Sequence, residues 1–141
     1  MYSIGELSRR TGVKVPTIRY YEDTGILDAP DRTGGNQRRY DSAGLERLAF
    51  IKHARDLGFS LEAIAALIQL RQAPEGSCHR ADEIARVQLA DVRSKIMRLR
   101  ALETELVRIS KSCDGQGVAD DCNVLAALAD HELFGTDHGA K

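Results

Sequence analysis

The residues of this sequence best suited to chemistry are its three cysteines, Cys78, Cys113 and Cys122. Thiolates bind soft metal ions and undergo thiol–disulfide exchange. Because the number is odd and all three lie in the C-terminal half, they fit a metal site or a redox centre better than a framework of structural disulfides. Cys113 and Cys122 close a short loop, so this pair can either share an ion or form a disulfide.

A long helix must position these cysteines. Between His79 and Lys111 the chain has no proline or glycine, and apolar residues recur mostly every three or four positions. At about 1.5 Å per residue this helix is roughly 50 Å long, so Cys78 and Cys113 of one chain cannot share an ion. If two copies pair antiparallel, Cys78 of one lies beside Cys113 and Cys122 of the other. The alternative is a dimerisation helix whose cysteines are incidental. The apolar positions are Ile84, Val87, Val92, Ile96, Leu99, Leu102, Leu106 and Ile109.

The length, composition and charge limit the fold classes and functions that the chain can have. A chain of 141 residues is long enough for one modest core and a projecting helix, and 5% aromatic residues with three prolines favour a mainly helical protein. The net charge is +2 over residues 1–71 and −3 over residues 72–141. This asymmetry is weak, so an assignment to nucleic acid must rest on local placement of charge. No stretch has the length of a membrane span or the apolar core of a signal peptide, which predicts a cytoplasmic protein.

The N-terminal region has the pattern of a helix-turn-helix. Ser3 and Glu6 form a capping box that starts a helix from Ile4 to Arg10, and Gly12 follows it. A second helix is predicted from Val15 to about Asp23, with Pro16 in its first turn and Gly25 after its end. In this motif the N-terminal residues of the second helix enter the major groove, although two core helices of another bundle give the same bare pattern. The residues so placed are Thr17, Arg19 and Tyr20.

A polar hairpin follows the two helices. Residues 30–40 carry the turn sequence Gly34-Gly35-Asn36 between short, polar flanks. A charged hairpin is usually a solvated loop, but directly after a helix-turn-helix it is typical of a wing. Its side chains can contact phosphates, which position a protein on DNA without reading its sequence. The candidates are Arg32, Arg38, Arg39 and Tyr40.

Two further helices complete the predicted head. The first spans Ser42 to Leu57 and ends at Gly58, and the second spans Leu61 to Arg71 after the cap residue Ser60. Their predicted core faces consist of Leu45, Leu48, Ile51 and Ala54 on the first and Leu61, Ile64, Leu67 and Ile68 on the second.

The expected division is a head over 1–71, a linker over 72–77, a dimerisation helix over 78–112 and a terminal segment over 113–141. That last segment holds the loop up to Cys122, a short helix from Asn123 to Leu128 and a tail. The fold class expected is therefore mainly α. It comprises a winged helix-turn-helix head, a long antiparallel coiled-coil dimerisation helix, and a short metal-binding loop and helix.

In this order, the elements resemble the MerR family of bacterial transcriptional activators. The resemblance rests on Tyr2 to Ser8, on Val15 to Glu22 followed by Gly25-Ile26-Leu27, on Gly35 to Tyr40 and on Arg47 to Ile51. It implies a homodimer on a palindromic operator, within a promoter whose spacer is too long for RNA polymerase. It further implies that effector binding bends and untwists this DNA. The implied DNA contacts are Thr17, Arg19, Tyr20, Arg38 and Tyr40.

Within that family, the metal sensors place one cysteine at the start of the long helix and two around the following loop, which here are Cys78, Cys113 and Cys122. Copper(I) sensors typically have serine at the first position, so Cys78 implies a divalent soft ion. Three sulfurs suit mercury or lead, whereas zinc prefers four ligands. The resemblance favours zinc, cadmium or lead, with mercury as the alternative. A fourth ligand can come from water or from His79, Asp114, Asp120, Asp121 or His131.

Other functions fit less well. The sequence has no catalytic motif, which predicts that it is not an enzyme. An iron–sulfur sensor needs more cysteines in the loop, and the drug-sensing relatives have a larger C-terminal domain. The stronger rivals are a thiol redox sensor that switches through a Cys113–Cys122 disulfide and a structural zinc site that only joins the dimer.

Overall fold

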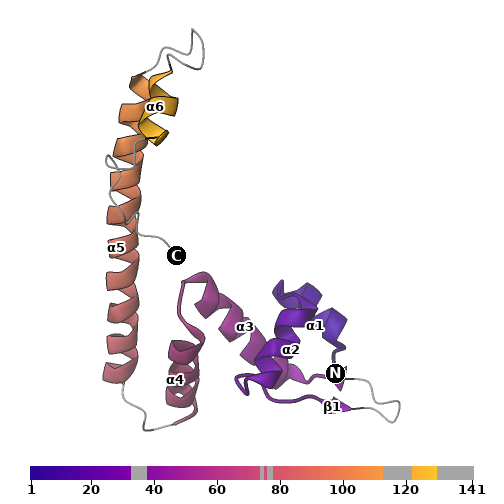
Figure 1. The fold of residues 1–141 in the computed structure, drawn as a ribbon. Coiled ribbons are helices and arrows are strands. Elements are labelled where there is room, and N and C mark those ends of the chain that lie inside the picture. The colour runs from indigo at the N-terminus through magenta and orange to yellow at the C-terminus, as the bar shows by residue number, and fades with distance from the viewer. Residues whose placement is uncertain (33–37, 74, 76–77, 113–121, 130–141) are drawn as a thin grey trace. The chain divides into compact units, whose positions relative to one another are not determined.

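The computed structural model of the chain describes residues 1–32, 38–73, 75, 78–112 and 122–129 (Figure 1). The fold is mainly helical, as predicted, and it divides into two compact units, Met1–Gln88 and Leu89–Lys141. None of the described helices is both long enough and apolar enough to cross a membrane. The elements are α1 (Ile4–Thr11), α2 (Val15–Asp23), β1 (Asp31–Arg32), β2 (Arg38–Arg39), α3 (Ser42–Asp56), α4 (Leu61–Gln72), α5 (Cys78–Lys111) and α6 (Asn123–Ala129).

The helix-turn-helix forms where its capping residues predict it. The Ser3 hydroxyl accepts a hydrogen bond from the Glu6 amide, and the Glu6 carboxylate accepts one from the Ser3 amide, both at 3.1 Å. The bond from the Ser3 amide, and after it the interaction with the Ser3 hydroxyl, lower the pKa of the Glu6 carboxyl because they favour its charged form. Gly12 ends α1 in the left-handed conformation, with φ +78°. The capping box and the turn between α1 and α2 are thus confirmed.

The predicted wing is a two-stranded antiparallel hairpin. Asp31 pairs with Arg39 and Arg32 pairs with Arg38, while the turn over 33–37 lies outside the described residues. Immediately after β2, Tyr40 bridges to Tyr2 through two backbone hydrogen bonds of 2.7 and 2.8 Å. The N-terminal segment therefore anchors the base of the wing.

One hydrophobic core holds the head together. In α3 and α4 it uses the faces predicted from the sequence, because Leu48, Ile51, Ala54, Ile64 and Ile68 are buried while Leu45, Leu61 and Leu67 are half-buried. Residues from α1, α2 and the segment after α2 complete it, namely Leu7, Val13, Ile18, Tyr21, Ile26, Leu27 and Tyr40.

The C-terminal helices also agree with the sequence to within one residue at their ends. α5 is a single helix of 34 residues. In the second unit, the Asn123 side-chain amide donates to the Ser112 carbonyl at 2.5 Å, so the start of α6 lies against the C-terminal end of α5. Ile109, near that end, is only 3% exposed.

Candidate DNA-binding surface and cysteine site

The second helix of the helix-turn-helix has one face in the core and one in solvent. Ile18 and Tyr21 are buried, which fixes the rotation of α2 about its axis. Arg19 and Tyr20 are exposed, the latter at 53%, and Thr17 is half-buried in the first turn. A guanidinium, a phenol and a hydroxyl at the start of an exposed helix can donate hydrogen bonds to base edges and phosphates.

The wing, which follows α2 in the sequence, carries further positively charged residues. Arg39 is half-buried in β2, whereas the side chains of Arg32 and Arg38 lie outside the described part of the wing. A cavity of about 250 Å³ lies at the wing base, lined by Pro30, Arg39, Tyr40, Arg47 and neighbouring residues. Arg47 of α3 also donates to the Ile26 carbonyl at 3.4 Å, which ties the segment after α2 to α3.

The sequence suggests that Tyr40 contacts a DNA phosphate, but in the structure this residue is buried and bonded within the head. Its side chain is 2% exposed, and its hydroxyl donates a hydrogen bond to the Glu22 carboxylate of α2. Together with the backbone bridge to Tyr2, this bond connects the N-terminus, the end of the wing and the helix predicted to read DNA. A direct contact from the Tyr40 hydroxyl to DNA therefore requires the bond to Glu22 to break.

Sequence reasoning missed the partners of Tyr40. Glu22 and Tyr2 both lie in stretches that resemble the family, but nothing in the sequence indicates that either residue contacts Tyr40. Tyr2 also lies beneath the Arg10 guanidinium, which is 4.9 Å from the ring centroid. In the sequence, Tyr2, Glu22 and Tyr40 lie beside predicted core positions, which is compatible with burial. Their spacing along the chain does not show that they contact one another.

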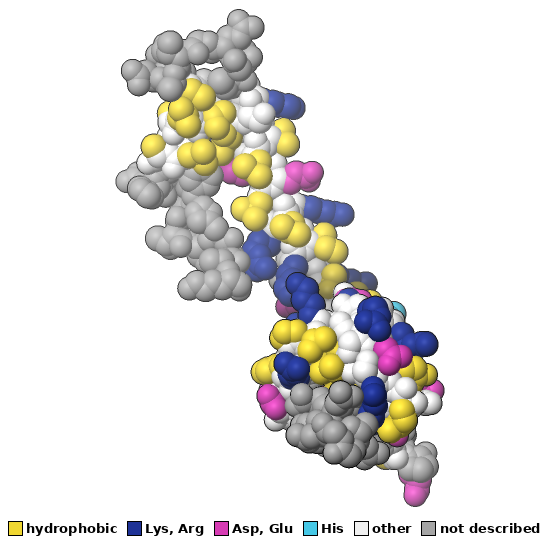
Figure 2. Space-filling view, turned by 90° about the vertical axis from the view of Figure 1, so that its right-hand side faces the viewer, with side chains coloured by type: hydrophobic (Ala, Val, Ile, Leu, Met, Phe, Trp, Pro, Cys, Tyr) yellow, Lys and Arg dark blue, Asp and Glu magenta, His cyan; other side chains and the backbone are white. Residues whose placement is uncertain are grey.

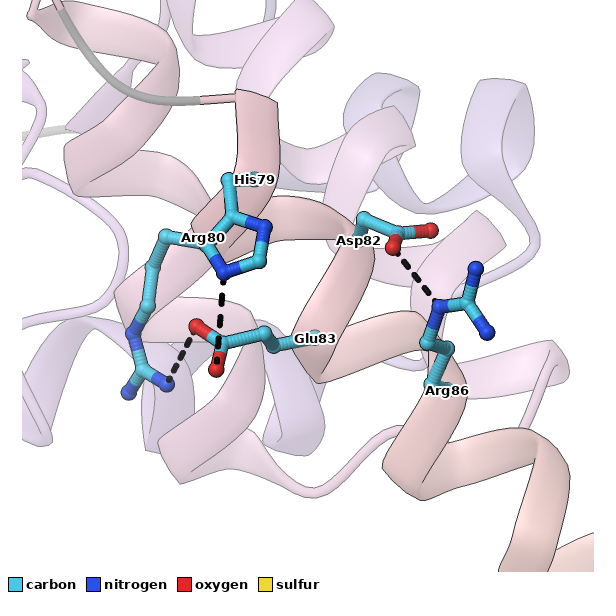
Figure 3. A network of polar contacts seen from close by, with 5 residues as sticks. All are labelled: His79, Arg80, Asp82, Glu83 and Arg86. Carbon is cyan, nitrogen blue, oxygen red and sulfur yellow. Dashed lines mark hydrogen bonds and ion pairs between the residues drawn. The ribbon is translucent and has the colours of Figure 1, made fainter.

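Cys78 is the first residue of α5 and is exposed. The turn that follows carries ion pairs between neighbouring helix positions (Figure 3). His79 Nε2 is 3.9 Å from Glu83 Oε2, Arg80 Nη1 is 4.0 Å from Glu83 Oε1, and Arg86 Nε is 2.7 Å from Asp82 Oδ2. Because these groups are solvent-exposed, the pairs contribute little to stability.

Cys122 is half-buried and directly precedes α6. Its carbonyl accepts a hydrogen bond of 3.1 Å from the Ala126 amide, so the backbone at Cys122 is fixed by the first turn of that helix. The remaining predicted ligand, Cys113, lies outside the described residues, as do the alternative ligands Asp114, Asp120, Asp121 and His131. Among the residues that are described, no three His, Cys, Asp or Glu side chains lie close enough to hold a metal ion.

Comparisons with known proteins identify relatives along the chain. Residues 2–70 match the model of the MerR HTH family of regulatory proteins, and residues 45–109 match a model described as MerR, DNA binding. The HTH-type transcriptional regulator ZntR of Escherichia coli K12 is 39% identical over 130 residues, which are 91% of this chain and 92% of ZntR. The mercuric resistance operon regulatory protein of Serratia marcescens is 37% identical over 126 residues, 89% of this chain and 86% of that protein.

A solved structure has the same fold. It is the transcription regulator PbrR691 from Ralstonia metallidurans CH34 in complex with lead(II), with a TM-score of 0.76 and 39% identity. The similarity covers 91% of this chain and 99% of that one. The similarity therefore extends well beyond the helix-turn-helix head.

The two tyrosines provide a test of this geometry. Tyr40→Phe removes the hydroxyl that bonds Glu22, and we expect it to lower the free energy of unfolding by about 1 kcal/mol, the net value of one hydrogen bond. Tyr20→Phe is the matched control, because its hydroxyl is on an exposed ring, and it should change stability by less than about 0.5 kcal/mol. Urea unfolding of both variants measures the difference. Equal stability of the two would contradict a structural role for the Tyr40 hydroxyl.

Proposed function

The chain belongs to the MerR family of helix-turn-helix regulatory proteins, and on this basis we propose that it is a metal-responsive transcriptional activator. It binds promoter DNA as a homodimer. A divalent soft ion binds Cys78 of one subunit together with Cys113 and Cys122 of the other, and the occupied dimer distorts the promoter so that RNA polymerase can use it. The observation that carries the proposal is the placement of Cys78 at the first residue of an uninterrupted helix of 34 residues.

The exposed face of α2 supports the DNA-binding part of the proposal. Arg19 and Tyr20 extend from a helix that the buried Ile18 and Tyr21 hold in one orientation, so their positions are set before DNA arrives. Thr17 lies in the first turn of α2, where a recognition helix contacts base edges. Arg38 and Tyr40 at the wing are further proposed contacts, the latter after release from Glu22.

The apolar side chains of α5 support a dimer. Most residues of the predicted seam are exposed within one chain, including Val87 at 71%, Leu99 at 64% and Leu106 at 61%. Figure 2 shows hydrophobic side chains on the surface of the long helix. Large apolar side chains exposed in this number along one helix are unfavourable in water and mark an interaction surface. Because α5 has the length and periodicity of a coiled-coil helix, a second copy of the same helix is the partner that fits it.

The length of α5 makes the proposed metal site intersubunit. At about 1.5 Å per residue, 34 residues extend roughly 50 Å. The Asn123 bond to Ser112 keeps Cys122 near the last turn of α5, whereas Cys78 is at its first residue. An antiparallel partner helix brings the first residue of one α5 to the last turn of the other, so each end of the dimer gains sulfurs from both chains.

The chemistry of three cysteines and the names of the relatives favour zinc, cadmium or lead, with mercury as the alternative. The name ZntR contains the symbol for zinc, and PbrR691 was solved in complex with lead(II). The Serratia relative is a regulatory protein of a mercuric resistance operon. A trigonal set of thiolates suits lead and mercury, and zinc needs a fourth ligand from water or from His79, Asp114, Asp120, Asp121 or His131.

We expect Arg19→Ala to weaken binding to the operator roughly 5- to 100-fold, because it removes a charged donor from the exposed face of α2. Metal affinity should not change. Fluorescence anisotropy at a fixed salt concentration measures the operator affinity, and Arg98→Ala, which removes an exposed arginine in the middle of α5, is the matched control. If the two variants bind the operator equally well, α2 does not read this DNA through Arg19.

The metal response is tested by titrating the reduced dimer with zinc, cadmium, lead, mercury and copper(I). Thiolate-to-metal absorbance and transcription in vitro are followed together. One divalent ion should bind at one per monomer while transcription rises in step, and Cys78→Ser, Cys113→Ser or Cys122→Ser should each abolish the rise while operator affinity stays within a few-fold. Binding without a transcriptional change would indicate a structural site, and a response to oxidant alone would indicate a disulfide switch.

Mixed dimers test the intersubunit arrangement separately. We expect a heterodimer of the Cys78→Ser chain with a Cys113→Ser, Cys122→Ser chain to regain one metal site, because one end of that dimer keeps all three thiols. Either homodimer should have none. Metal stoichiometry of dimers purified with two different affinity tags measures this, and a heterodimer without metal would rule out the intersubunit site.

A further inference from the structure

The turn between α3 and α4 is bonded to α5 by one side chain. The amide nitrogen Nε2 of Gln88 donates a hydrogen bond of 2.9 Å to the Leu57 carbonyl oxygen. Leu57 is the residue that caps the C-terminus of α3, where carbonyl groups lack partners within the helix. The bond joins residues 31 positions apart in the sequence, so it is a tertiary contact between the head and the long helix.

The next residue leaves little space around this bond. Gly58 has φ +90°, a conformation that residues with a side chain rarely adopt. A Cβ atom added at Gly58 would lie 2.5 Å from Gln88 Nε2. Gly25 has nearly the same conformation, with φ +84°, yet a Cβ added there meets no described atom within 4 Å. The close approach at Gly58 is therefore specific to Gln88 and does not follow from the turn conformation alone.

The start of α5 belongs structurally to the head. The compact unit that contains the helix-turn-helix ends at Gln88, inside α5. Ile84 lies four positions before Gln88, on the same face of the helix, and is 9% exposed, whereas Val87 between them is 71% exposed. Ile84 and Gln88 thus form one inward-facing edge, and Cys78 is at the beginning of the same helical segment.

We propose that Gln88 is a positioning residue that couples the occupancy of Cys78 to the α3–α4 turn, and through it to the orientation of the head on DNA. This inference rests on the proposed metal response. An α-helix transmits displacement along its axis, so an ion that shifts Cys78 also shifts Gln88. The bond to Leu57 weakens when its donor–acceptor distance increases by more than a few tenths of an ångström. Gly58 lies directly beside this bond. The Gln88–Leu57 bond therefore differs between the two states, which is what a coupling contact requires.

The test uses Gln88→Glu in the full-length dimer. This change keeps the size of the side chain but replaces the donor with an acceptor opposite a carbonyl oxygen. Gln69→Glu makes the same chemical change at an exposed residue of α4 and is the matched control. The readout is the ratio of transcription with and without saturating lead(II), with zinc(II) in a parallel series. Operator affinity and metal stoichiometry are measured for each variant.

We expect Gln88→Glu to reduce the induction ratio about five-fold, the factor that corresponds to one neutral hydrogen bond. Metal stoichiometry and operator affinity of the metal-free dimer should stay within two-fold, and Gln69→Glu should behave as the wild type. An unchanged induction ratio in Gln88→Glu overturns the coupling role. If the wild type itself responds to neither ion, the proposed metal response fails first, and the coupling proposal fails with it.

A second pair of variants keeps the proposal testable if Gln88→Glu does not fold. Gly58→Ala introduces both the unfavourable conformation and the clash with Gln88, whereas Gly25→Ala introduces only the former. We expect Gly58→Ala to reduce induction more than Gly25→Ala does, because only Gly58→Ala adds a clash with Gln88. The double variant Gly58→Ala, Gln88→Ala should exceed the loss seen in Gln88→Ala alone by no more than the loss seen in Gly25→Ala. Additive losses in the double variant would show that Gly58 and Gln88 act independently and would overturn the proposal.

Discussion

The length and continuity of α5 are the constraint on which the rest of the proposed mechanism depends. A helix of 34 residues without a break cannot bring its first residue to its last turn, so Cys78 and Cys122 are separated by the helix itself. The apolar side chains between them are largely exposed in one chain. Pairing of two such helices would cover those side chains and place sulfurs from both chains at each end. In the proposed mechanism, α5 alone would link dimerisation to ion binding.

The head is built around a different kind of constraint. Its core is small, and three backbone segments that are distant in sequence meet at Tyr40, which bonds Tyr2 through the backbone and Glu22 through the hydroxyl. Because Glu22 is on α2, the base of the wing and the helix that would enter the major groove are held in one arrangement. DNA recognition by such a head depends on this fixed geometry as much as on the exposed arginine and tyrosine of α2.

The boundary between the two compact units lies within α5, between Gln88 and Leu89. The first turns of α5 contribute Ile84 and Gln88 to the head unit, while the remainder of the helix carries the exposed seam. A regulator of the proposed type must convert a local event at a metal site into a change in DNA geometry, which costs on the order of a few kcal/mol. A helix that is part of both units is a direct physical connection for that purpose.

The sequence by itself determined the features that depend on neighbours along the chain. Helix ends followed from Ser3, Gly12, Gly58 and Ser60, and the core faces of α3 and α4 followed from periodicity, because capping and amphipathicity act over three or four residues. The order of elements and the motif in α2 indicated the family. The position of Cys78 at the start of α5 was also readable, since the helical pattern begins directly after it.

Only the tertiary structure decided which distant polar groups meet. The burial of Tyr40 against Glu22 and the bond from Gln88 to Leu57 join residues 18 and 31 positions apart. No periodicity encodes such pairs, because they depend on how helices pack in three dimensions. The sequence treats Tyr40 and Arg38 as equivalent wing residues. In the folded head Tyr40 is buried, since its ring contributes to the core and its hydroxyl donates a hydrogen bond to the Glu22 carboxylate.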